Sequence, residues 1–566
     1  VRAGGRQPGL FLVHEFSGAD AYFPVLGQHL PGDFPIYGLP GIALGQPQLR
    51  TMECLAARLV ELIREVQPQG PYRLAGWSFG GVLAYEIAIQ LLGQDQPVQF
   101  LGLLDSYVPR LTDQGKARWA GEAAHKRHLL LQCSAWLTVE GPAGSDGLAQ
   151  VRQLEQDLDR FDFDGLLEHC RERQLLPASL GSVSSQALWP FIDREVAHGH
   201  ALAHYRLHPI GMPVHLFRAG ERTSELARRS ESLGWAEALG RGELRCIEVP
   251  GDHLSMMQAP HVQVLGQALG DALERAQVAP GSVHQPLLTI QQGRAGRTPI
   301  FCVPGAGDSV TGFIGLTDAL GPDWPVIGLQ PRGLDGESVP HSCVESAAQL
   351  YLQALEQACP EGPLHLVGHS FGGWVAFEMA TRLQAAGRKV ASLTLIDSES
   401  PGGNSVIGKP YTTTAALQRL VEAMQLASGK SLGIDAQAFA EQDDNTQLAQ
   451  LHAGMVRVGL LSARAAPQAM HGPARTFASA LRTVYRPQRR FVGRASLVLA
   501  DDPTLDAAGN QREQQAMVAG WSAQVDELTV WYGPGNHFSL LKAPAVSQLA
   551  AWWLGRLSAA VEEGVS

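Results

Sequence analysis

The chain has 566 residues, of which 45% are apolar and 17% charged, with 35 prolines and a formal net charge of −11. This length exceeds what one hydrophobic core usually supports and predicts two domains of about 280 residues each. The negative charge excludes a non-specific nucleic-acid-binding protein, which needs a basic face. Seven scattered cysteines without Cys-x-x-Cys spacing indicate reduced thiols, with neither a disulfide framework nor a zinc site.

Targeting signals are absent from the sequence pattern. The first 20 residues lack the basic start and cleavage site of a secretory signal, and no run of about 18 apolar residues could span a bilayer. We therefore expect a cytoplasmic protein without a membrane or nucleic-acid partner. Because the chain begins without methionine and almost directly at a strand, we expect a monomeric fragment of a longer protein.

The first half alternates short apolar strands with helices. We expect strands and helices in the order strand 10–13, strand 35–39, helix 51–66, strand 72–75, helix 82–92, strand 100–104, strand 214–217 and strand 244–249. Between about 109 and 205 the pattern is helical, with helices at 122–136 and 150–167 and no clear strand. Such an insertion between core strands is typical of a lid over an active site.

The second half repeats this order after a Pro-Gly-Ser break and a short linker. We expect strands at 300–303, 325–329, 364–367, 393–396, 495–499 and 528–531, and helices at 344–357 and 375–383. A helical stretch from about 411 to 485 again replaces strands. Alternating strands and helices favour a mostly parallel, doubly wound sheet in each half.

A six-residue motif occurs once in each half. Residues 76–81 are Gly-Trp-Ser-Phe-Gly-Gly, and residues 368–373 are Gly-His-Ser-Phe-Gly-Gly. Each copy follows an expected strand and precedes an expected helix, which is the context of a nucleophile elbow, where glycines let the backbone pass close to a strained turn. The repeated context predicts Ser78 and Ser370 as nucleophiles.

An acid and a base follow each serine. Asp105 and Asp397 end apolar strands, each 27 residues after its serine, which indicates that one unit was duplicated. His253 and His537 each follow a later apolar strand, and each is followed by an Ala-Pro pair. The order Ser, Asp, His is that of the α/β-hydrolase fold. The base would deprotonate the serine, and the acid would hold the imidazole in the right tautomer.

We therefore predict two tandem α/β-hydrolase domains, each a mostly parallel, doubly wound sheet with a helical lid insertion. The first spans residues 1–278 with a lid at about 109–205, and the second spans residues 291–566 with a lid at about 401–490. A linker at 279–290 joins them, and its shortness predicts that the domains touch.

The acid of each triad has an alternative position. Many α/β-hydrolases place it one strand later, where Glu221 stands in the first half and Asp501 and Asp502 stand in the second. The equal spacing from serine in both halves favours Asp105 and Asp397.

Two other groups of side chains allow more than one interpretation. His200, His204 and His208 fall at helical spacing, but no carboxylate or cysteine completes a metal-ligand set nearby, so we predict packed or solvated histidines and no metal site. The pairs Arg228–Arg229 and Arg489–Arg490 are either solvated surface or contacts for an acidic carrier domain.

Backbone N–H groups must stabilise the negative oxygen that forms during acyl transfer. The residue after each nucleophile, Phe79 or Phe371, supplies one donor. The loop after the first strand of each half should supply the second, and Phe16 and Ala306 are the candidates. This loop is not the His-Gly-Gly-Gly of lipases, which disfavours an ordinary lipase.

These motifs in combination resemble the C-terminal thioesterase domains of bacterial non-ribosomal peptide synthetases. In the first half they are Phe-Leu-Val-His-Glu-Phe-Ser-Gly, Gly-Trp-Ser-Phe-Gly-Gly, Leu-Leu-Asp-Ser and Val-Pro-Gly-Asp-His-Leu-Ser-Met. In the second they are Phe-Cys-Val-Pro-Gly-Ala-Gly, Gln-Pro-Arg-Gly-Leu-Asp-Gly, Gly-His-Ser-Phe-Gly-Gly and Gly-Asn-His-Phe. Two units in tandem are similar to the double thioesterases that end some lipopeptide and depsipeptide synthetases. The first half departs from the family's commoner His-Pro-Ala-Gly-Gly loop at Glu15 and Phe16.

The resemblance implies that a peptide on the 4'-phosphopantetheine arm of an upstream peptidyl carrier domain passes to serine and is then released. No cofactor bound by the chain itself is implied. Release by water gives a linear acid, and release by the peptide's own hydroxyl or amine gives a macrocycle. Our hypothesis is that the first domain is the main cyclase, forming a macrolactone, and that the second assists, hydrolyses or edits.

Two alternatives remain open at this point. One is a duplicated carboxylesterase that acts on free esters and ignores carrier-bound peptides. The other is one active thioesterase beside a degenerate docking module, which is disfavoured because both halves retain Ser, Asp and His.

Overall fold

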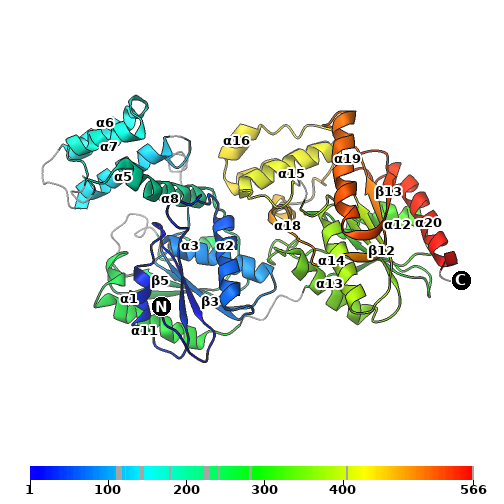
Figure 1. The fold of residues 1–566 in the computed structure, drawn as a ribbon, viewed down its shortest axis with the longest axis horizontal. Helices are drawn as coiled ribbons and strands as arrows, with labels where there is room; N and C mark the ends of the chain where they lie inside the picture. Colours follow the sequence, from blue (N-terminus) through cyan, green and yellow to red (C-terminus); the bar gives the residue numbers. More distant parts are fainter. Residues whose placement is uncertain are drawn as a thin grey trace. The chain divides into compact units, whose positions relative to one another are not determined.

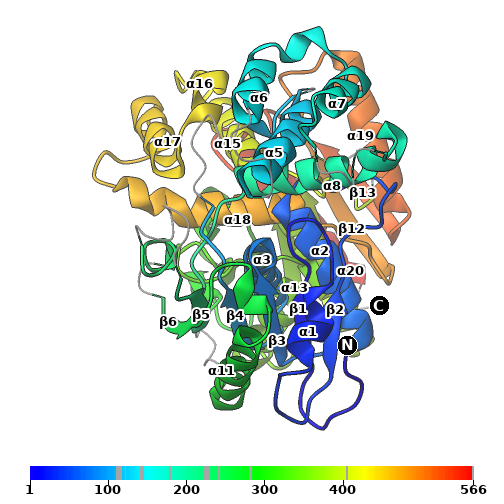
Figure 2. The same cartoon turned by 90° about the vertical axis from the view of Figure 1, so that its left-hand side faces the viewer.

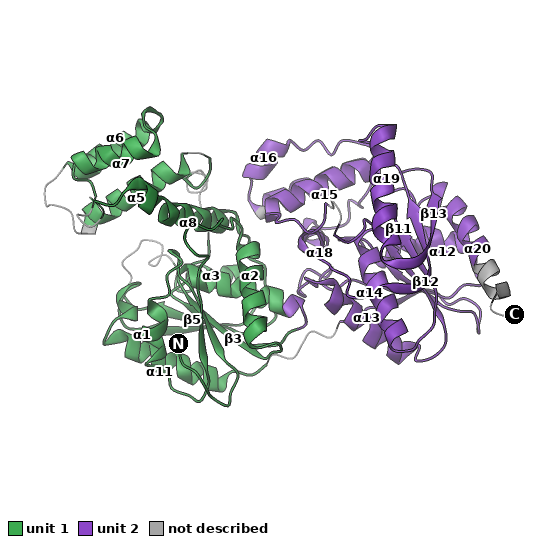
Figure 3. Ribbon diagram, viewed as in Figure 1, with its two compact units in different colours: residues 1–91, 96–280 green, residues 92–95, 281–566 purple. Residues whose placement is uncertain are grey.

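The computed structural model describes residues 1–109, 118–121, 123–139, 146–176, 180, 182–221, 230–239, 242–278, 284–402 and 406–563. Parts of both predicted lids, residues 279–283 of the predicted linker and the pair Arg228–Arg229 lie outside these residues. The chain divides into two compact units, residues 1–91 with 96–280 and residues 92–95 with 281–566 (Figure 3). Among the described residues, no helix is both long and apolar enough to cross a membrane.

The first unit is built on a parallel sheet of six described strands in the order β2-β1-β3-β4-β5-β6 (Figure 2). The strands are β1 (Leu10–Val13), β2 (Ile36–Leu39), β3 (Tyr72–Trp77), β4 (Val98–Leu104), β5 (Val214–Ala219) and β6 (Leu244–Val249). All four residues of β1 are fully buried, as expected for a central strand with both faces covered.

Helices cover both faces of this sheet. Helices α1 (Tyr22–Gly27) and α11 (His261–Arg275) share one core with Leu10 and Leu12 of β1. Helices α2 (Met52–Val66) and α3 (Phe79–Gly93) lie on the other face (Figures 1 and 2). Thr51 caps α2 because its side-chain oxygen accepts a hydrogen bond from the N–H of Cys54 at 3.2 Å.

The second unit repeats the strand order and adds one edge strand. Its sheet runs β13-β12-β11-β10-β8-β9-β7, and only the β7–β9 pair among the described strands is antiparallel. The strands are β7 (Leu287–Gln291), β8 (Ile300–Val303), β9 (Val326–Leu329), β10 (Leu364–His369), β11 (Val390–Ile396), β12 (Phe491–Leu499) and β13 (Val525–Tyr532). Residues 287–290, which we expected in the linker, therefore belong to the second sheet. Arg2 makes a matching antiparallel bridge to Ile36 in the first unit.

Strand β8 shows how the second core is divided between two faces. Ile300 and Cys302 pack with α12 (Ile314–Leu320) and α20 (Ala545–Glu563), while Phe301 and Val303 pack on the opposite side. Side chains alternate across a strand, so a continuous apolar run fills both cores. The helices of the opposite face are α13 (Val344–Ala358), α14 (Phe371–Ala385) and α19 (Ala507–Ser522).

Each unit carries a helical insertion with a small core of its own. The described helices of the first are α5 (Ala124–Val139), α6 (Gly147–Gln156), α7 (Phe163–Glu172) and α8 (Ser185–His204). Those of the second are α15 (Thr413–Ser428), α16 (Ala436–Glu441), α17 (Asp444–Val458) and α18 (His471–Arg482).

The prediction of a single helix over 150–167 is wrong. The structure has two helices there, because the Asp162 carboxylate accepts from the N–H of Gly165 at 2.7 Å and starts α7. The remaining short helices are α10 (Trp235–Leu239) and the 3₁₀ turns Leu158–Arg160, Ser255–Met257, Val310–Phe313 and Pro467–Met470. The predicted fold class of two mostly parallel α/β sheets, each with a helical insertion, is confirmed.

Candidate active site

Ser78 stands at a sharp turn between β3 and α3. Its φ of 56° lies in the left-handed region that non-glycine residues rarely adopt. A Cβ on Gly76 would lie 2.0 Å from the Gly80 carbonyl oxygen, and one on Gly80 would lie 2.5 Å from the His14 carbonyl oxygen. The flanking glycines therefore allow backbone segments to meet behind the serine and leave its hydroxyl at the carboxyl edge of the sheet.

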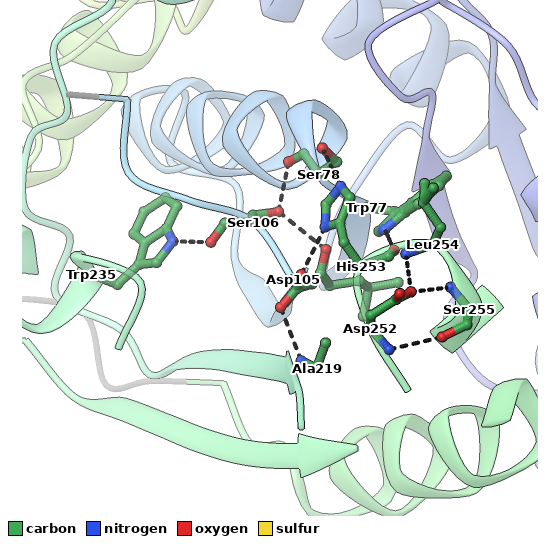
Figure 4. A network of polar contacts seen from close by, with 11 residues as sticks. Trp77, Ser78, Asp105, Ser106, Ala219, Trp235, Asp252, His253, Leu254 and Ser255 are labelled. Carbon is green, nitrogen blue, oxygen red and sulfur yellow. Dashed lines mark hydrogen bonds and ion pairs between the residues drawn. The ribbon is translucent and has the colours of Figure 1, made fainter. Parts of the chain in front are cut away.

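The structure brings Ser78, His253 and Asp105 together (Figure 4). The Ser78 Oγ lies 3.1 Å from His253 Nε2, and His253 Nδ1 lies 2.7 Å from Asp105 Oδ2. The other carboxylate oxygen, Asp105 Oδ1, accepts a hydrogen bond from the N–H of Ala219 at 2.9 Å. Only 2% of Asp105 is exposed. This arrangement allows the hydroxyl proton to move to Nε2 while the carboxylate stabilises the resulting imidazolium.

Hydrogen bonds from neighbouring side chains hold these groups in place (Figure 4). Ser106 Oγ donates to the Ser78 carbonyl at 2.7 Å, and Trp235 Nε1 donates to the Ser106 carbonyl at 2.8 Å. Trp77 Nε1 donates to the His253 carbonyl at 3.1 Å. Sequence analysis missed all three roles. The only available signal was the Asp-Ser pair that ends the strand after the elbow in both halves.

The turn that carries His253 is held by its own neighbour. The Asp252 carboxylate accepts from the N–H groups of Leu254 at 3.0 Å and Ser255 at 2.8 Å. These two hydrogen bonds lower the pKa of Asp252, with Ser255 making the larger contribution. The histidine therefore stands on a short, hydrogen-bonded turn at the sheet edge.

The second unit repeats much of this arrangement. Ser370 has a φ of 54° between β10 and α14, and His537 Nδ1 lies 2.8 Å from Asp397 Oδ2. Asp397 Oδ1 accepts from the N–H of Ala500 at 3.1 Å. His369, which precedes the serine, donates from Nε2 to the His537 carbonyl at 3.1 Å. Trp77 makes the equivalent hydrogen bond to the His253 carbonyl in the first unit. Burial lowers the pKa of His369 to about 3, which keeps this ring neutral.

The two sites differ in the surroundings of the candidate base, His253 in the first unit and His537 in the second. Among the described residues, no hydrogen bond joins His537 Nε2 to Ser370 Oγ. Burial alone would lower the pKa of His537, but the hydrogen bond and charge of Asp397, together with the charges of Asp308 and Glu399, raise it above 6.5. The second site therefore carries extra negative charge around its base.

Asp308 is the source of charge that sequence analysis did not single out. Its residue is exposed, and its Oδ2 lies 3.4 Å from the point where a Cβ on Gly305 would stand. The Cβ of Ser370 lies 3.2 Å from the same point. The carboxylate and the serine thus border one small space beside Gly305. Desolvation raises the pKa of Asp308, against the opposing effects of His537 and Lys542.

The residues expected to supply the oxyanion donors lie near each other within each unit. In the first, the rings of Phe16 and Phe79 meet edge to face at 5.8 Å, and neither backbone N–H donates to another described residue. In the second, Ala306 and Phe371 both line one pocket.

In the described structure, the alternative acids Glu221, Asp501 and Asp502 do not form hydrogen bonds with His253 or His537. The Glu221 N–H donates to the Gly251 carbonyl at 2.9 Å. Asp501 accepts from Gln514 Nε2 at 2.9 Å, and Asp502 accepts from the N–H of Thr504 at 2.8 Å. The Nδ1 atoms of these histidines contact the carboxylates of Asp105 and Asp397 instead.

The side chains of His200 and His204, both in α8, contact backbone carbonyls, while His208 lies beyond the end of that helix. His200 Nδ1 donates to the Arg50 carbonyl at 3.0 Å, and His204 Nδ1 donates to the His200 carbonyl at 2.8 Å. The carbonyl of His208 accepts from the hydroxyl of Tyr85 at 2.7 Å. Within the part of the chain that the structure describes, no group of three or more His, Cys, Asp or Glu side chains could hold a metal ion.

The second arginine pair is only partly free for a partner. Arg490 Nη2 donates to the Val525 carbonyl at 2.8 Å and lies 3.7 Å from Asp526. Its guanidinium therefore contacts its own sheet. The first pair, Arg228–Arg229, lies outside the described residues.

Comparison with known proteins finds the same family in both units. A family model described as the thioesterase domain matches residues 8–269 and again residues 298–551. The vanchrobactin synthetase VabF of Vibrio anguillarum is 45% identical over 113 residues, which are 19% of this chain and 4% of that protein. A probable non-canonical non-ribosomal peptide synthetase, CymA of Salinispora arenicola, is 28% identical over 284 residues, 49% of this chain and 3% of that protein.

Two solved structures each align with about half of the chain. The Vlm2 thioesterase domain is 22% identical and covers 47% of this chain and 95% of its own, with a TM-score of 0.36. The type II thioesterase BorB from the borrelidin biosynthetic cluster is 21% identical and covers 48% of this chain and 99% of its own, with a TM-score of 0.34. The chain spans only 4% and 3% of the length of the two curated relatives named above. Because the thioesterase model matches most of its length in two successive copies, the chain belongs to the thioesterase domain family.

Proposed function

We propose that the chain releases a peptide from the phosphopantetheine thioester of an upstream carrier domain, through acyl-serine intermediates on Ser78 and Ser370. The observation that carries the proposal is the arrangement in the first unit, with 3.1 Å from Ser78 Oγ to His253 Nε2 and 2.7 Å from His253 Nδ1 to Asp105. Membership of the thioesterase family supports a thioester as substrate. The synthetase relatives support a carrier domain as the source of the peptide.

The reaction has two acyl transfers. Ser78 Oγ attacks the thioester carbonyl as His253 takes its proton, the C–S bond breaks, and the leaving thiol receives that proton. The N–H groups of Phe16 and Phe79 stabilise the intermediate oxyanion. In the second transfer His253 deprotonates water or a peptide hydroxyl, which attacks the ester carbonyl. The C–O bond to Ser78 then breaks, and His253 returns the proton to Oγ.

We assign macrolactone formation to the first unit and a hydrolytic, assisting or editing role to the second. In the first, the ring of Phe16 lies 5.8 Å from the rings of both Phe79 and Trp119, which makes an apolar wall beside the nucleophile. An apolar wall favours cyclisation because it keeps water from the acyl-enzyme. In the second unit the matching loop offers Ala306 and the charged Asp308, which give a less apolar surrounding than Phe16 and Trp119.

The test is product analysis with a peptidyl thioester, comparing the wild type with Ser78→Ala and Ser370→Ala. We expect the cyclic product, lighter than the linear acid by one water, to disappear with Ser78→Ala and to persist with Ser370→Ala. The reverse pattern would overturn the division of labour. Fast turnover of simple esters, with no reaction of the peptidyl thioester, would favour the free-ester carboxylesterase instead.

A separate readout tests the docking-module alternative. A unit that only docks a partner should form no acyl adduct, so intact-protein mass spectrometry of each single serine variant shows whether the remaining unit is acylated. The variant with both serines replaced is the control and should carry no adduct.

A further inference from the structure

The loop that carries Phe16 in the first unit is tied to the lid. His198 belongs to α8, the lid helix nearest the sheet (Figures 1 and 2), and none of its surface is exposed. Its Nδ1 donates a hydrogen bond to the Phe16 carbonyl at 2.7 Å. This is a partly buried contact between residues that are 182 positions apart in the sequence.

The peptide unit before Phe16 is fixed from its carbonyl side. The Glu15 carbonyl accepts from His14 Nδ1 at 2.9 Å and from the N–H of Gly18 at 2.9 Å. The Glu15 carbonyl and the Phe16 N–H belong to one planar trans peptide and point in opposite directions. Hydrogen bonds that hold the carbonyl therefore also set the direction of the N–H.

The peptide unit after Phe16 is fixed at both of its ends. Its carbonyl is held by His198, and its N–H, which belongs to Ser17, donates to Glu15 Oε2 at 2.9 Å. The hydroxyl of Ser17 also donates to the Glu15 carboxylate. Phe16 thus stands between two anchored peptide planes. Glu15, the residue that departs from the family's commoner loop, supplies part of this anchoring.

The two histidines and Phe79 form one stack. The rings of His14 and His198 are 5.2 Å apart with planes 22° from parallel, and the rings of His198 and Phe79 are 4.8 Å apart at 18°. Phe79 is the residue proposed to give the other oxyanion donor. Burial lowers the pKa of His198 to about 4, so the ring is neutral and its one proton stays on Nδ1 as the donor to Phe16.

A second residue of α8 covers the end of the same loop. A Cβ on Gly18, which has a φ of 75°, would lie 2.8 Å from Arg194 Nε. Arg194 precedes His198 by one helical turn, so both side chains lie on the same face of α8. The lid therefore contacts the loop at two points.

We propose that His198 is a positioning residue. From the lid it holds the Phe16 carbonyl and, together with His14, aims the Phe16 N–H at the oxyanion that forms on the acyl carbonyl at Ser78. This inference rests on the proposed acyl transfer at Ser78. It means that the first unit has a complete oxyanion site only while α8 is seated on the loop.

The experiment uses the full chain with Ser370→Ala, so that Ser78 is the only candidate nucleophile that can be labelled. A fluorophosphonate forms an Oγ–P bond to serine as the P–F bond breaks, with fluoride leaving and the hydroxyl proton passing to His253. We expect His198→Ala to slow this labelling by about tenfold or more, since loss of a well-aimed oxyanion donor costs about 10²–10³ in rate and misaiming it costs part of that. With an acyl N-acetylcysteamine thioester, kcat should fall while KM changes by less than about twofold.

Matched substitutions separate positioning from folding. His198→Asn can place an amide N–H where Nδ1 stands and should recover most of the rate, whereas His198→Gln places its amide further out and should not. His200→Ala, on the same helix but bonded to the Arg50 carbonyl, should label at the parent rate. Equal labelling rates in the Asn, Gln and parent proteins would overturn the proposal, and because all three keep a polar side chain this comparison remains decisive even if the Ala variant unfolds.

One further variant separates this inference from the proposed function. Adding Ser78→Ala to the same background should abolish labelling. If labelling persisted, the assignment of the nucleophile would fail, whatever His198 does. If labelling stopped but the His198 variants matched the parent, only the inference about the lid would fail.

Discussion

The two units place the same residue types at the same strand ends, yet they hold the loop after the first strand in different ways. In the first unit, hydrogen bonds from His14 and His198 anchor the peptides around Phe16. In the second, the loop is glycine-rich, and a Cβ on Gly307 would lie 2.8 Å from both the Pro473 carbonyl oxygen and the Phe477 Cβ.

This difference shows which parts of the site the duplicated scaffold determines. The strands, the elbow and the Asp–His contact depend on the sheet and are shared, with left-handed φ values of 44° at Asp105 and 45° at Asp397. The loop depends on the lid helix above it, which differs between the units. We therefore expect shared effects from the acids and unit-specific effects from the loops.

Replacing the acids should give the largest effects and should test the shared part. Asp105→Asn and Asp397→Asn, each measured with the other unit's serine replaced by alanine, should lower kcat for a thioester by about 10⁴-fold, because the amide favours the wrong imidazole tautomer. Glu221→Gln and Asp501→Asn are the matched controls and should leave kcat within about twofold. A loss of less than tenfold for Asp397→Asn alone would mean that Ser370 does not depend on the acid as Ser78 does.

Alanine substitutions at Gly18 and Gly307 should distinguish how the loop after the first strand is held in each unit. Both Gly18 and Gly307 have positive φ, at 75° and 71°, so each substitution carries a backbone strain of about 1–2 kcal/mol. At Gly307 the new Cβ also meets a backbone oxygen, whereas at Gly18 it meets the flexible Arg194 side chain.

We expect Gly307→Ala to slow fluorophosphonate labelling of Ser370 by about tenfold or more, since overpacking typically adds about 1–3 kcal/mol. Gly18→Ala should slow labelling of Ser78 by less. Labelling is the suitable readout because unfolding of a chain with two units need not be two-state. The reverse ranking would show that the lid contact at Arg194 is the stiffer of the two.

Asp308→Asn should give the smallest effect, confined to the second unit. The base must be neutral to accept the serine proton, so activity at Ser370 falls as pH drops through the pKa of His537, which is raised above 6.5. Removing the negative charge of Asp308 destabilises the imidazolium, so the midpoint of the pH profile should move to lower pH. The profile of Ser78 in the same protein should not move, and an unchanged Ser370 profile would contradict the electrostatic role of Asp308.

Much of the shared scaffold could be predicted because it depends on local patterns. The central strands were recognisable as short apolar runs, and the residues of β1, β6 and β8 match the expected ranges. Asp105 and Asp397 could be singled out as candidate acids because the 27-residue spacing repeats. The edge strand β7 was missed because its exposed side chains give no continuous apolar run.

The unit-specific features depend on tertiary contacts that no local pattern encodes. Trp77 and His369 have little chemistry in common, yet each donates to the carbonyl of the histidine in its own unit. His198 was not singled out in the sequence, because its partner Phe16 lies 182 residues earlier in the chain. The charge of Asp308 was visible in the sequence, but its position beside Ser370 was not.

The central claim is that both units are working acyl-transfer sites, and counting covalent labels tests it most directly. Intact-protein mass spectrometry after saturating fluorophosphonate should show two adducts on the wild type, one on Ser78→Ala, one on Ser370→Ala and none on the double variant. A single adduct on the wild type, or any adduct on the double variant, would contradict the account.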